Sequence, residues 1–376
     1  MTRELREIAA RVSQLGPGKD AVLATVIDVR GSGYRLPGAR MLILENGDTF
    51  GTVSGGCLEA DVLERAKKVL KSGRAEVFTY DTTADENSVF SLNMGCRGVI
   101  RIMLEPIGPD SELARLIASV TNKREKYSVA TYIGGDIKTG LDVGTRLFVG
   151  SDGVLSAGAR SCVTAVPGID DDLLTFHESS GAYETMRYVT DAGEAEFAFE
   201  TLSPPVLVAI FGAGADAVPL ARSAFDLGWQ VDVLDHRPAF LTRERFPDAR
   251  ELVSVDRDNN DHDLATDNLT AIVSMNHNYD RDRETLRFAL GTDAFYIGML
   301  GPKKRTEQML DELRGRGEVF DSNALARLKY PAGLDIGGDS PESIAISIIA
   351  EIQSVLKHRT GGPLRDRPGS IYDRKQ

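Results

Sequence analysis

The chain has 376 residues, 42% of them hydrophobic, which is enough to bury the cores of roughly two or three ordinary domains. Its formal net charge of −12 argues against a surface for nucleic acid or anionic lipid, because such surfaces need clustered Lys and Arg. No apolar run reaches the roughly 18 residues of a membrane span, and the charged N-terminus is unlike a signal peptide. We therefore expect a cytoplasmic protein with no nucleic-acid and no membrane partner.

The first part of the chain is typical of a helix followed by strands. Residues 5–15 carry apolar side chains at a helical spacing, which the glycines of segment 16–18 end. Residues 21–29 and 39–53 are typical of strands, the second interrupted by the hairpin signal Asn46-Gly47. Residues 58–71 follow as an amphipathic helix. This order predicts an α+β domain, which we assign to residues 1–200.

Two segments of this domain resemble each other at a constant offset of 106 residues. A duplicated strand motif and a chance match both explain the identities. The second segment lacks the SGGC stretch of the first, so after a duplication the chemistry would remain with the first copy. Six residues recur in 24 aligned positions: Ala24, Thr25, Ile27, Gly38, Arg40 and Gly47 return as Ala130, Thr131, Ile133, Gly144, Arg146 and Gly153.

Beyond a predicted linker at residues 201–205, strands alternate with helices. Residues 206–235 predict a strand, a glycine turn, a helix and a second strand. Further strands are expected within 270–275 and 294–301, before a helix over 341–359. Such alternation implies a parallel sheet with crossover helices. The predicted fold class is α/β, an N-terminal α+β domain followed by a C-terminal Rossmann-like parallel-sheet domain over residues 206–360, with a polar tail over 361–376.

The stretch FGAGADA contains the GxGxxA form of the dinucleotide-binding fingerprint. Gly212 and Gly214 follow a strand, and Asp235 ends the next strand 21 residues beyond Gly214. Such glycines let the backbone approach a phosphate at a helix N-terminus, and an acid at this position binds ribose hydroxyls. A turn of this kind can also be needed only for packing the strand against the helix. The fingerprint therefore indicates a Rossmann-like fold more strongly than it indicates that NAD(P) binds there.

The stretch YIGMLGPKKR is a second candidate for phosphate binding. Gly298 and Gly301 follow an apolar strand, and the cations Lys303, Lys304 and Arg305 come directly after them. Open α/β sheets bind ligands at this carboxyl edge, and cations beside a glycine turn suit a phosphate or the phosphate arm of a pterin. A solvated helix start is the alternative.

Two histidines, His236 in LDHRP and His277 in SMNHNYDRD, end strands of the same domain. We expect both at one crevice of the sheet edge as cofactor contacts. A surface or hydrogen-bonded structural role is the alternative for each. The absence of an HExxH pattern argues against a metal-only hydrolase.

The three cysteines are too few and too scattered for a disulfide framework or a complete iron–sulfur redox enzyme. In GTVSGGCLEADV, Gly55 and Gly56 turn the chain into a helix, so that Cys57 is expected at its first turn. Unpaired N–H groups and the helix dipole favour a thiolate there. Glu59 either opposes the thiolate by repulsion or takes a proton during thiol chemistry.

Cys96 lies in LNMGCRGVI, where flanking glycines make a thiol accessible to a ligand and Arg97 favours its thiolate. A buried cysteine chosen for its size is the alternative for both Cys57 and Cys96. Cys162 has no such flanks, and we expect it to be structural.

Eight motifs in the same order are similar to those of the XdhC/CoxI family of xanthine dehydrogenase accessory factors. The resemblance spans about Leu5 to Leu356. The motifs are GSGYRLPGARMLI, GTVSGGCLEADV, LNMGCRGVI, IFGAGADAVPLA, VLDHRPAF, MNHNYDRD, YIGMLGPKKR and GLDIGGDSPESIAISIIAEI.

The resemblance implies a cytoplasmic maturation protein that binds molybdenum cofactor (molybdopterin), protects it during sulfuration and delivers it to an apo molybdenum hydroxylase. The client would be of the xanthine dehydrogenase or carbon monoxide dehydrogenase type. A cysteine desulfurase and a second copy of the chain are further partners that this role admits. On this basis we expect Cys57 and Cys96 to face one crevice between the domains, where one or both contact molybdenum or its sulfur, with Gly55, Gly56 and Arg97 beside the cofactor.

The chain departs from the family at three positions. Arg97 replaces a glycine of the GCGG stretch, Ala215 replaces a histidine, and Tyr330 replaces a histidine before GLDIG. These changes put the identity of the ligand in doubt more than the fold. The rival functions are an NAD(P)-dependent oxidoreductase built on the same turn and a scaffold that docks the hydroxylase. A maturation factor without xanthine dehydrogenase activity of its own remains the expectation.

Overall fold

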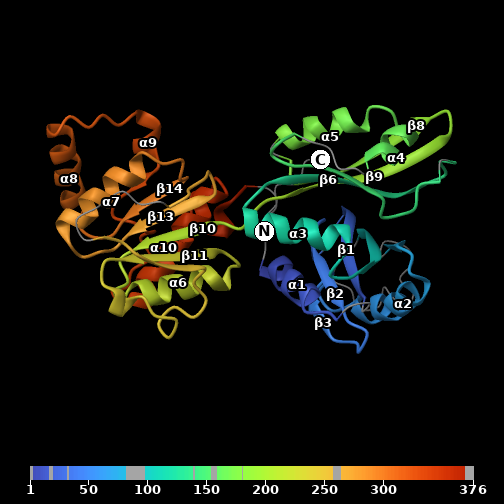
Figure 1. Ribbon diagram of the computed structural model, residues 1–376, viewed down its shortest axis with the longest axis horizontal. Coiled ribbons are helices and arrows are strands. Elements are labelled where there is room, and N and C mark those ends of the chain that lie inside the picture. Colours follow the sequence, from blue (N-terminus) through green and yellow to red (C-terminus); the bar gives the residue numbers. More distant parts are fainter. Residues whose placement is uncertain are drawn as a thin grey trace. The chain divides into compact units, whose positions relative to one another are not determined.

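The computed structural model describes residues 3–16, 20–31, 34–81, 98–138, 140–153, 159–179, 181–256 and 264–368. The chain divides into two compact units, Met1–Pro204 (unit 1) and Pro205–Gln376 (unit 2). Figure 1 shows that each unit has its own sheets and its own covering helices. Each unit therefore builds its own hydrophobic core.

Unit 1 contains two antiparallel sheets. The first has the order β3-β2-β1-β5-β4. Its strands are β1 (Ala21–Gly31), β2 (Arg40–Ile43), β3 (Thr49–Gly51), β4 (Glu76–Asp81) and β5 (Gly98–Ile107). The second has the order β7-β6-β9-β8. Its strands are β6 (Tyr127–Gly135), β7 (Arg146–Val149), β8 (Tyr183–Thr190) and β9 (Gly193–Leu202). The hairpin predicted at Asn46-Gly47 is confirmed, since β2 and β3 pair on either side of it.

Helices cover the sheets of unit 1 through amphipathic faces. Helix α2 (Glu59–Ser72) packs its apolar side chains on one face of the first sheet, and α1 (Arg3–Ser13) and α3 (Glu112–Lys123) pack on the other. Helices α4 (Ala159–Ala165) and α5 (Ile169–Glu178) cover the second sheet. Ile27 and Met103 of the first sheet contact Ile133 and Ala198 of the second. The two sheets therefore face each other within unit 1.

The recurrence at an offset of 106 residues extends to the backbone pairing. Thr25 pairs with Arg40 in the first sheet, as Thr131 pairs with Arg146 in the second. Each central strand has a register shift at the same relative place, at Ile27 and at Ile133. A bulge alters strand geometry in a specific way, so the two segments share a local backbone irregularity in addition to their identical residues. The duplication itself stays a prediction.

The repeated arginines form buried ion pairs that connect the two sheets reciprocally. Arg40 of the first sheet pairs with Glu200 of the second. Arg146 of the second sheet pairs with Glu105 of the first, with N–O distances of 2.6 and 2.7 Å. Each half of unit 1 thus supplies the partner for a charge that the other half buries.

Unit 2 is built on a parallel sheet in the order β12-β11-β10-β13-β14-β15. Its strands are β10 (Leu207–Phe211), β11 (Gln230–Asp235), β12 (Glu251–Ser254), β13 (Thr270–Ser274), β14 (Tyr296–Met299) and β15 (Leu328–Lys329). The strand order reverses direction at β10, which lies between β11 and β13. This reversal is the place where open α/β sheets bind ligands at their carboxyl edge.

Alternate residues of β10 face the two layers of helices in unit 2. Val208 and Ile210 pack with α6 (Ala217–Asp226) and α10 (Pro341–Leu356). Ala209 and Phe211 pack with α7 (Tyr279–Leu290), α8 (Lys303–Gly315) and α9 (Ser322–Ala326). Figure 1 shows these two groups of helices on opposite faces of the sheet. The predicted fold class, an α+β domain followed by a Rossmann-like domain, is confirmed.

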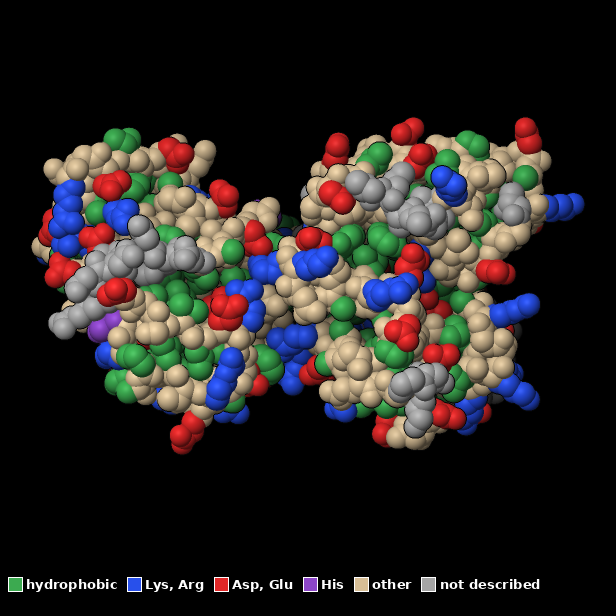
Figure 2. Space-filling model, in the orientation of Figure 1, with side chains coloured by type: hydrophobic (Ala, Val, Ile, Leu, Met, Phe, Trp, Pro, Cys, Tyr) green, Lys and Arg blue, Asp and Glu red, His purple; other side chains and the backbone are tan. Residues whose placement is uncertain are grey.

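The predicted linker at 201–205 starts too early. Strand β9 runs to Leu202, which pairs with Tyr127, so Thr201 and Leu202 belong to the second sheet. The division between the units falls at Pro204 and Pro205. Within the described ranges, the structure contains no helix with the length and apolar character that a membrane span requires. On the face shown in Figure 2, basic and acidic side chains are interspersed over both units.

Candidate functional site

The glycine turn after β10 contains two glycines with different environments. Gly212 has a φ of +110°, and a Cβ there would come within 2.4 Å of the backbone oxygen of Met275. At Gly214 the nearest atom to an added Cβ is Cδ2 of His277, at 3.8 Å. Gly212 is therefore needed by the fold, whereas Gly214 faces space that a ligand could use.

The turn also offers backbone donors at the start of α6. Among the described residues, the N–H groups of Gly214, Ala215 and Asp216 have no hydrogen-bond acceptor. Helix N-termini with unpaired N–H groups favour anions, because the donors and the helix dipole act together. This arrangement fits the predicted phosphate turn at Gly212 and Gly214.

Asp235, predicted to bind ribose hydroxyls, is only 1% exposed. Its Oδ2 accepts from the Ala213 N–H at 2.7 Å and from Arg237 Nη2 at 2.8 Å, and its Oδ1 accepts from the Arg237 N–H and Nε at 2.8 and 3.0 Å. Burial raises the pKa of this carboxyl, but the hydrogen bonds from Arg237 and Ala213 outweigh burial and lower it to about 2. The carboxylate is charged, enclosed and holds the turn.

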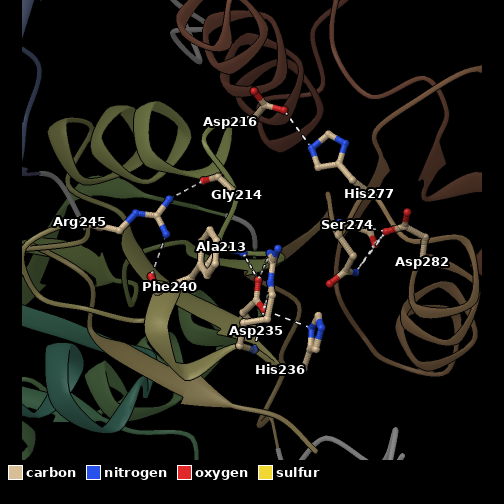
Figure 3. A network of polar contacts seen from close by, with 12 residues as sticks. Ala213, Gly214, Asp216, Asp235, His236, Phe240, Arg245, Ser274, His277 and Asp282 are labelled. Carbon is tan, nitrogen blue, oxygen red and sulfur yellow. Dashed lines mark hydrogen bonds and ion pairs between the residues drawn. The ribbon is translucent and has the colours of Figure 1, made fainter. Parts of the chain in front are cut away.

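Two arginines and an aromatic ring lie beside this carboxylate. Arg237 and Arg245 approach the ring of Phe240, with guanidinium carbons 4.2 and 4.9 Å from its centroid. Phe240 lies in the short 3-10 helix Pro238–Phe240 and is 37% exposed. Arg245 donates to the carbonyl of Gly214 at 3.2 Å and to that of Phe240 at 3.1 Å, so it ties the glycine turn to the segment after β11 (Figure 3).

The two predicted histidines differ in their exposure. His236 is half-buried, with Nδ1 at 3.2 Å from Oδ1 of Asp235. His277 is 58% exposed, and its Nε2 lies 3.0 Å from Oδ2 of Asp216 at the N-terminus of α6. His277 has a φ of +54°, an unusual backbone conformation for a residue with a side chain. Figure 3 shows His277 pointing toward Asp216, so the loop after β13 is joined to the glycine turn.

A buried carboxylate at the same edge is a feature that sequence reasoning missed. Asp282, 2% exposed, accepts from Ser274 Oγ at 2.8 Å and from the N–H of Asn276 at 3.1 Å. Its second oxygen accepts from Arg305 Nη2 at 2.7 Å. A usable signal was its spacing, because Asp282 follows the N-cap Asn278 by four residues and so returns to the strand end.

The ion pair with Asp282 gives Arg305 a different environment from Lys303 and Lys304, the other two cations predicted at the start of α8. Arg305 is held at the sheet edge by Asp282, whereas Lys303 and Lys304 are exposed. Gly298 lies within β14, where a Cβ would come within 2.7 Å of the Tyr296 ring, so packing already explains this glycine. Gly301 has an open Cβ position, with Cδ of Arg305 at 3.8 Å. Ligand contacts by these residues stay predictions.

In unit 1, the SGGC turn presents its glycines and its thiol to solvent. Gly55, Gly56 and Cys57 are all exposed, and the ring of Tyr34 lies over Gly55, 3.3 Å from where a Cβ would stand. Helix α2 begins at Glu59, with Leu58 as its N-cap. Cys57 thus lies before the N-cap and outside the helix, so the prediction that it belongs to the first helical turn is wrong. The turn is held in a non-helical form up to Cys57 because Ser54 and Glu59 accept from the N–H groups of this segment.

Glu59 folds back over this turn and holds it. Its Oε1 accepts from Thr52 Oγ1 at 2.6 Å and from the Ser54 N–H at 2.9 Å, and its Oε2 accepts from the Ser54 hydroxyl and from the Leu58 N–H at 3.2 Å. Burial raises the pKa of Glu59, but the hydrogen bonds from Ser54 and Thr52 outweigh burial and lower it. A carboxylate with a lowered pKa and both oxygens occupied favours a positioning role over proton transfer.

The other two cysteines contribute less to the site. Burial raises the pKa of Cys162 to about 11, which agrees with a structural residue in the core of unit 1. Cys96 and Arg97 lie outside the described residues, so the predicted pairing of Cys57 with Cys96 stays a prediction. Within the ranges that the structure describes, no group of three His, Cys, Asp or Glu side chains is arranged to hold a metal ion.

Together, the fold and these turns define a protein with a Rossmann-type parallel-sheet domain and an antiparallel α+β domain that carries an exposed thiol. Comparison with known families narrows this class. A profile described as the XdhC Rossmann domain matches residues 208–352, and a profile described as the XdhC and CoxI family matches residues 15–81. The chain belongs to the XdhC and CoxI family.

Relatives with known names align with both units. A Bacillus subtilis protein named as a probable xanthine dehydrogenase component is 28% identical, over 90% of this chain and 94% of that protein. The molybdenum cofactor insertion chaperone PaoD of Escherichia coli is 24% identical, over 93% of this chain and 87% of that protein. A crystal structure of a Bacillus halodurans protein described as a xanthine dehydrogenase superposes with a TM-score of 0.70 at 27% identity, over 98% of each chain.

Proposed function

We propose that this chain is a maturation protein that binds molybdenum cofactor, assists its sulfuration and inserts it into an apo molybdenum hydroxylase. The observation that carries the proposal is the alignment of both units, over 93% of the chain, with a relative named as a molybdenum cofactor insertion chaperone. The client is a hydroxylase of the xanthine dehydrogenase or carbon monoxide dehydrogenase type. A cysteine desulfurase and a second copy of the chain are partners consistent with this role.

The carboxyl edge of unit 2 supports the phosphate-binding part of this proposal. The cofactor carries a pterin with a phosphate, and the turn at Gly214 offers unpaired backbone N–H groups at a helix N-terminus. Because an added Cβ at Gly214 meets no atom closer than 3.8 Å, the backbone there can be approached by a bulky ligand. At the same edge Arg305 is paired with Asp282 and Arg237 with Asp235, whereas no carboxylate of the described residues forms an ion pair with Arg245, which supplies uncompensated positive charge.

The SGGC turn of unit 1 supports the sulfur and molybdenum part. Cys57 is exposed, and its Sγ lies 3.7 Å from Oγ of Ser54. A thiolate is a soft ligand that suits molybdenum and can carry sulfur. We therefore propose that one or both of Cys57 and Cys96 contact the molybdenum centre or its sulfur, and that Gly55, Gly56 and Arg97 lie beside the cofactor.

The rival proposal is an NAD(P)-dependent oxidoreductase built on the same turn. The GxGxxA spacing and the parallel sheet favour it. The enclosed carboxylate of Asp235 weighs against NAD as the cofactor of such an enzyme, because an acid that binds a ribose diol needs a free, accessible oxygen. It does not weigh against NADP, which carries a phosphate in place of one of these hydroxyls. Thermal shifts with NADH and with molybdopterin separate the two proposals. A pull-down with cofactor-depleted protein tests the third alternative, a scaffold that only docks the hydroxylase.

The proposal is tested by transferring cofactor from the purified chain to an apo-hydroxylase. Wild-type protein loaded with cofactor should restore hydroxylase activity, and Cys57→Ser and Cys96→Ser should reduce the restored activity about tenfold or more. Cys162→Ala is the matched control, because it removes a thiol buried in the core. Transfer at wild-type rate by both Cys57→Ser and Cys96→Ser would refute the role of the thiols.

The same preparation should not oxidise xanthine on its own, because the sequence has no cysteine set for iron–sulfur clusters. The measurement is NAD-linked urate formation by the wild-type chain, after removal of contaminating hydroxylase. Turnover by the chain alone would overturn the assignment as a maturation protein.

A further inference from the structure

The acid at the end of β11, Asp235, is arranged differently from the acid that binds a ribose diol in dinucleotide-binding domains. In such domains the acid at the end of this strand hydrogen-bonds the ribose hydroxyls. Here four hydrogen bonds from within the protein reach Asp235, which is 1% exposed. A carboxylate has about four lone-pair positions, so this one has no capacity left for a hydroxyl pair.

The groups that are accessible at this place are cationic. The side chain of Arg237 is 39% exposed, and its charge is balanced by Asp235. Arg245 donates to two backbone carbonyls, and within the described residues no carboxylate forms an ion pair with it. The uncompensated charge of Arg245 therefore lies directly beside the unpaired N–H groups of the Gly214 turn.

Phe240 gives this cationic site a defined shape. Both guanidinium groups lie within 5 Å of the centroid of its ring, at 4.2 and 4.9 Å, which restricts the orientation of the two planar groups. Arg237 donates to Asp235 through Nε and Nη2, and Arg245 donates to two carbonyls through Nη1 and Nη2. Because a guanidinium has five N–H groups, each arginine keeps donors in a fixed plane for a phosphate oxygen. The contact of Arg245 with the Gly214 carbonyl then sets the distance between this site and the phosphate turn.

We propose that Arg237, Phe240 and Arg245 form a phosphomonoester-binding subsite that excludes an unphosphorylated ribose diol. Negative groups at this edge that oppose an anion include Asp216, paired with His277, Asp235, paired with Arg237, and Asp282, paired with Arg305. Two ligands bring the required chemistry: the pterin phosphate of molybdenum cofactor and the 2′-phosphate of NADPH. This proposal rests on one part of the proposed function, namely that the ligand binds at the carboxyl edge of the sheet of unit 2.

The test compares probes that differ only in one phosphomonoester. The first pair is NADPH and NADH, and the second is the oxidised pterin of the cofactor with and without its phosphate. In each pair that binds, the phosphorylated member should bind wild-type protein at least about tenfold more tightly, as expected for a charge-assisted contact. Equal binding of the two members of either pair, or no binding of any of the four probes, would overturn the subsite.

Variants test whether Arg245 causes the tighter binding of the phosphorylated probes. Arg245→Gln should reduce this preference to about twofold or less, and Arg245→Lys, which keeps the charge but not the planar fork, should give an intermediate value. Arg243→Gln is the matched control, since Arg243 lies on the same loop, donates to the carbonyls of Ala249 and Arg250, and its loss changes the net charge equally. A preference that survives in Arg245→Gln, or that Arg243→Gln reduces as much, contradicts the proposal.

The outcomes also separate this subsite from the proposed function. A preference for NADPH over NADH with no binding of either pterin supports the subsite and counts against a molybdenum cofactor chaperone. Tight binding of both pterins with no effect of the phosphate supports the chaperone and refutes the subsite.

Discussion

Two glycine turns, one in each unit, have the same construction and differ in what they expose. At Gly55 to Cys57 in unit 1, the carboxylate of Glu59 accepts from backbone N–H groups and hydroxyls and leaves a thiol at the surface. After β10 in unit 2, the carboxylate of Asp235 accepts from Ala213 and leaves the N–H groups of the helix start unpaired. One turn presents an exposed thiol, and the other presents backbone N–H groups that have no acceptor among the described residues.

The comparison shows what an acid beside a glycine turn does in this molecule. The sequence predicts a ribose contact for Asp235, and for Glu59 it leaves repulsion of the Cys57 thiolate and proton uptake during thiol chemistry as alternatives. In both cases hydrogen bonds outweigh burial, so that the pKa falls and the carboxylate remains charged. Each acid stabilises the conformation of its turn, and the neighbouring residues remain available to a ligand.

The largest expected effect distinguishes the two glycines of the second turn. Gly212→Ala should destabilise unit 2 by about 3 kcal/mol, because the new Cβ meets the Met275 carbonyl and φ is positive. Gly214→Ala should cost less than about 0.5 kcal/mol, since its Cβ position is open. Urea unfolding followed by the fluorescence of Trp229, the single tryptophan, buried in the core of unit 2, measures both. Equal stability of the two variants would contradict this distinction.

The next effect concerns the carboxylate of the second turn. Asp235→Asn should destabilise unit 2 by about 2 kcal/mol, because it leaves Arg237 without a charged partner. Since its folded pKa of about 2 lies below the ordinary 3.8, the contribution of Asp235 is complete above the ordinary value and is lost as the pH falls toward 2.

The same urea experiment at pH 6 and pH 3 tests this dependence. Wild-type protein should lose about 1 kcal/mol more than Asp235→Asn between the two pH values. An identical loss in both proteins would show that Asp235 does not hold the turn as a charged group.

A smaller effect is expected at the first turn. Glu59→Gln should weaken the loop from Thr52 to Leu58 by about 1 kcal/mol, because it replaces a charged acceptor of several hydrogen bonds with a neutral amide. Hydrogen exchange at Ser54 and Leu58 should become faster. Glu64→Gln, an exposed acid on the same helix, is the control and should leave this exchange unchanged. Unchanged exchange in Glu59→Gln would argue that the loop is held by other contacts.

The fold could be predicted from the sequence because its signals are local. The hairpin at Asn46-Gly47, the glycine turn after β10 and the start of the last long helix at Pro341 each depend on neighbouring residues, and the structure has all three. The linker prediction failed at Thr201 because a paired strand end looks like a polar connection until its partner strand is known.

The site was harder to predict because its polar residues act over long sequence separations. Arg245 reaches Gly214 across 31 residues, and Arg305 reaches Asp282 across 23. The spacing of Asp235 predicted its position correctly, but whether its oxygens face a ligand or Arg237 depends on packing that no pattern encodes. The reciprocal pairs Arg40 with Glu200 and Arg146 with Glu105 show the same limit, although the repeated arginines were visible as identities.

The central claim is that this chain binds molybdenum cofactor at the Gly214 turn. The most direct measurement is the equilibrium binding of the cofactor to purified wild-type protein and to Gly214→Val, with Trp229 fluorescence confirming that both are folded. The account predicts saturable binding by the wild type and at least about a tenfold loss in Gly214→Val, since the added side chain would fill the space beside His277. Equal binding by both proteins, or no binding by the wild type, would contradict it.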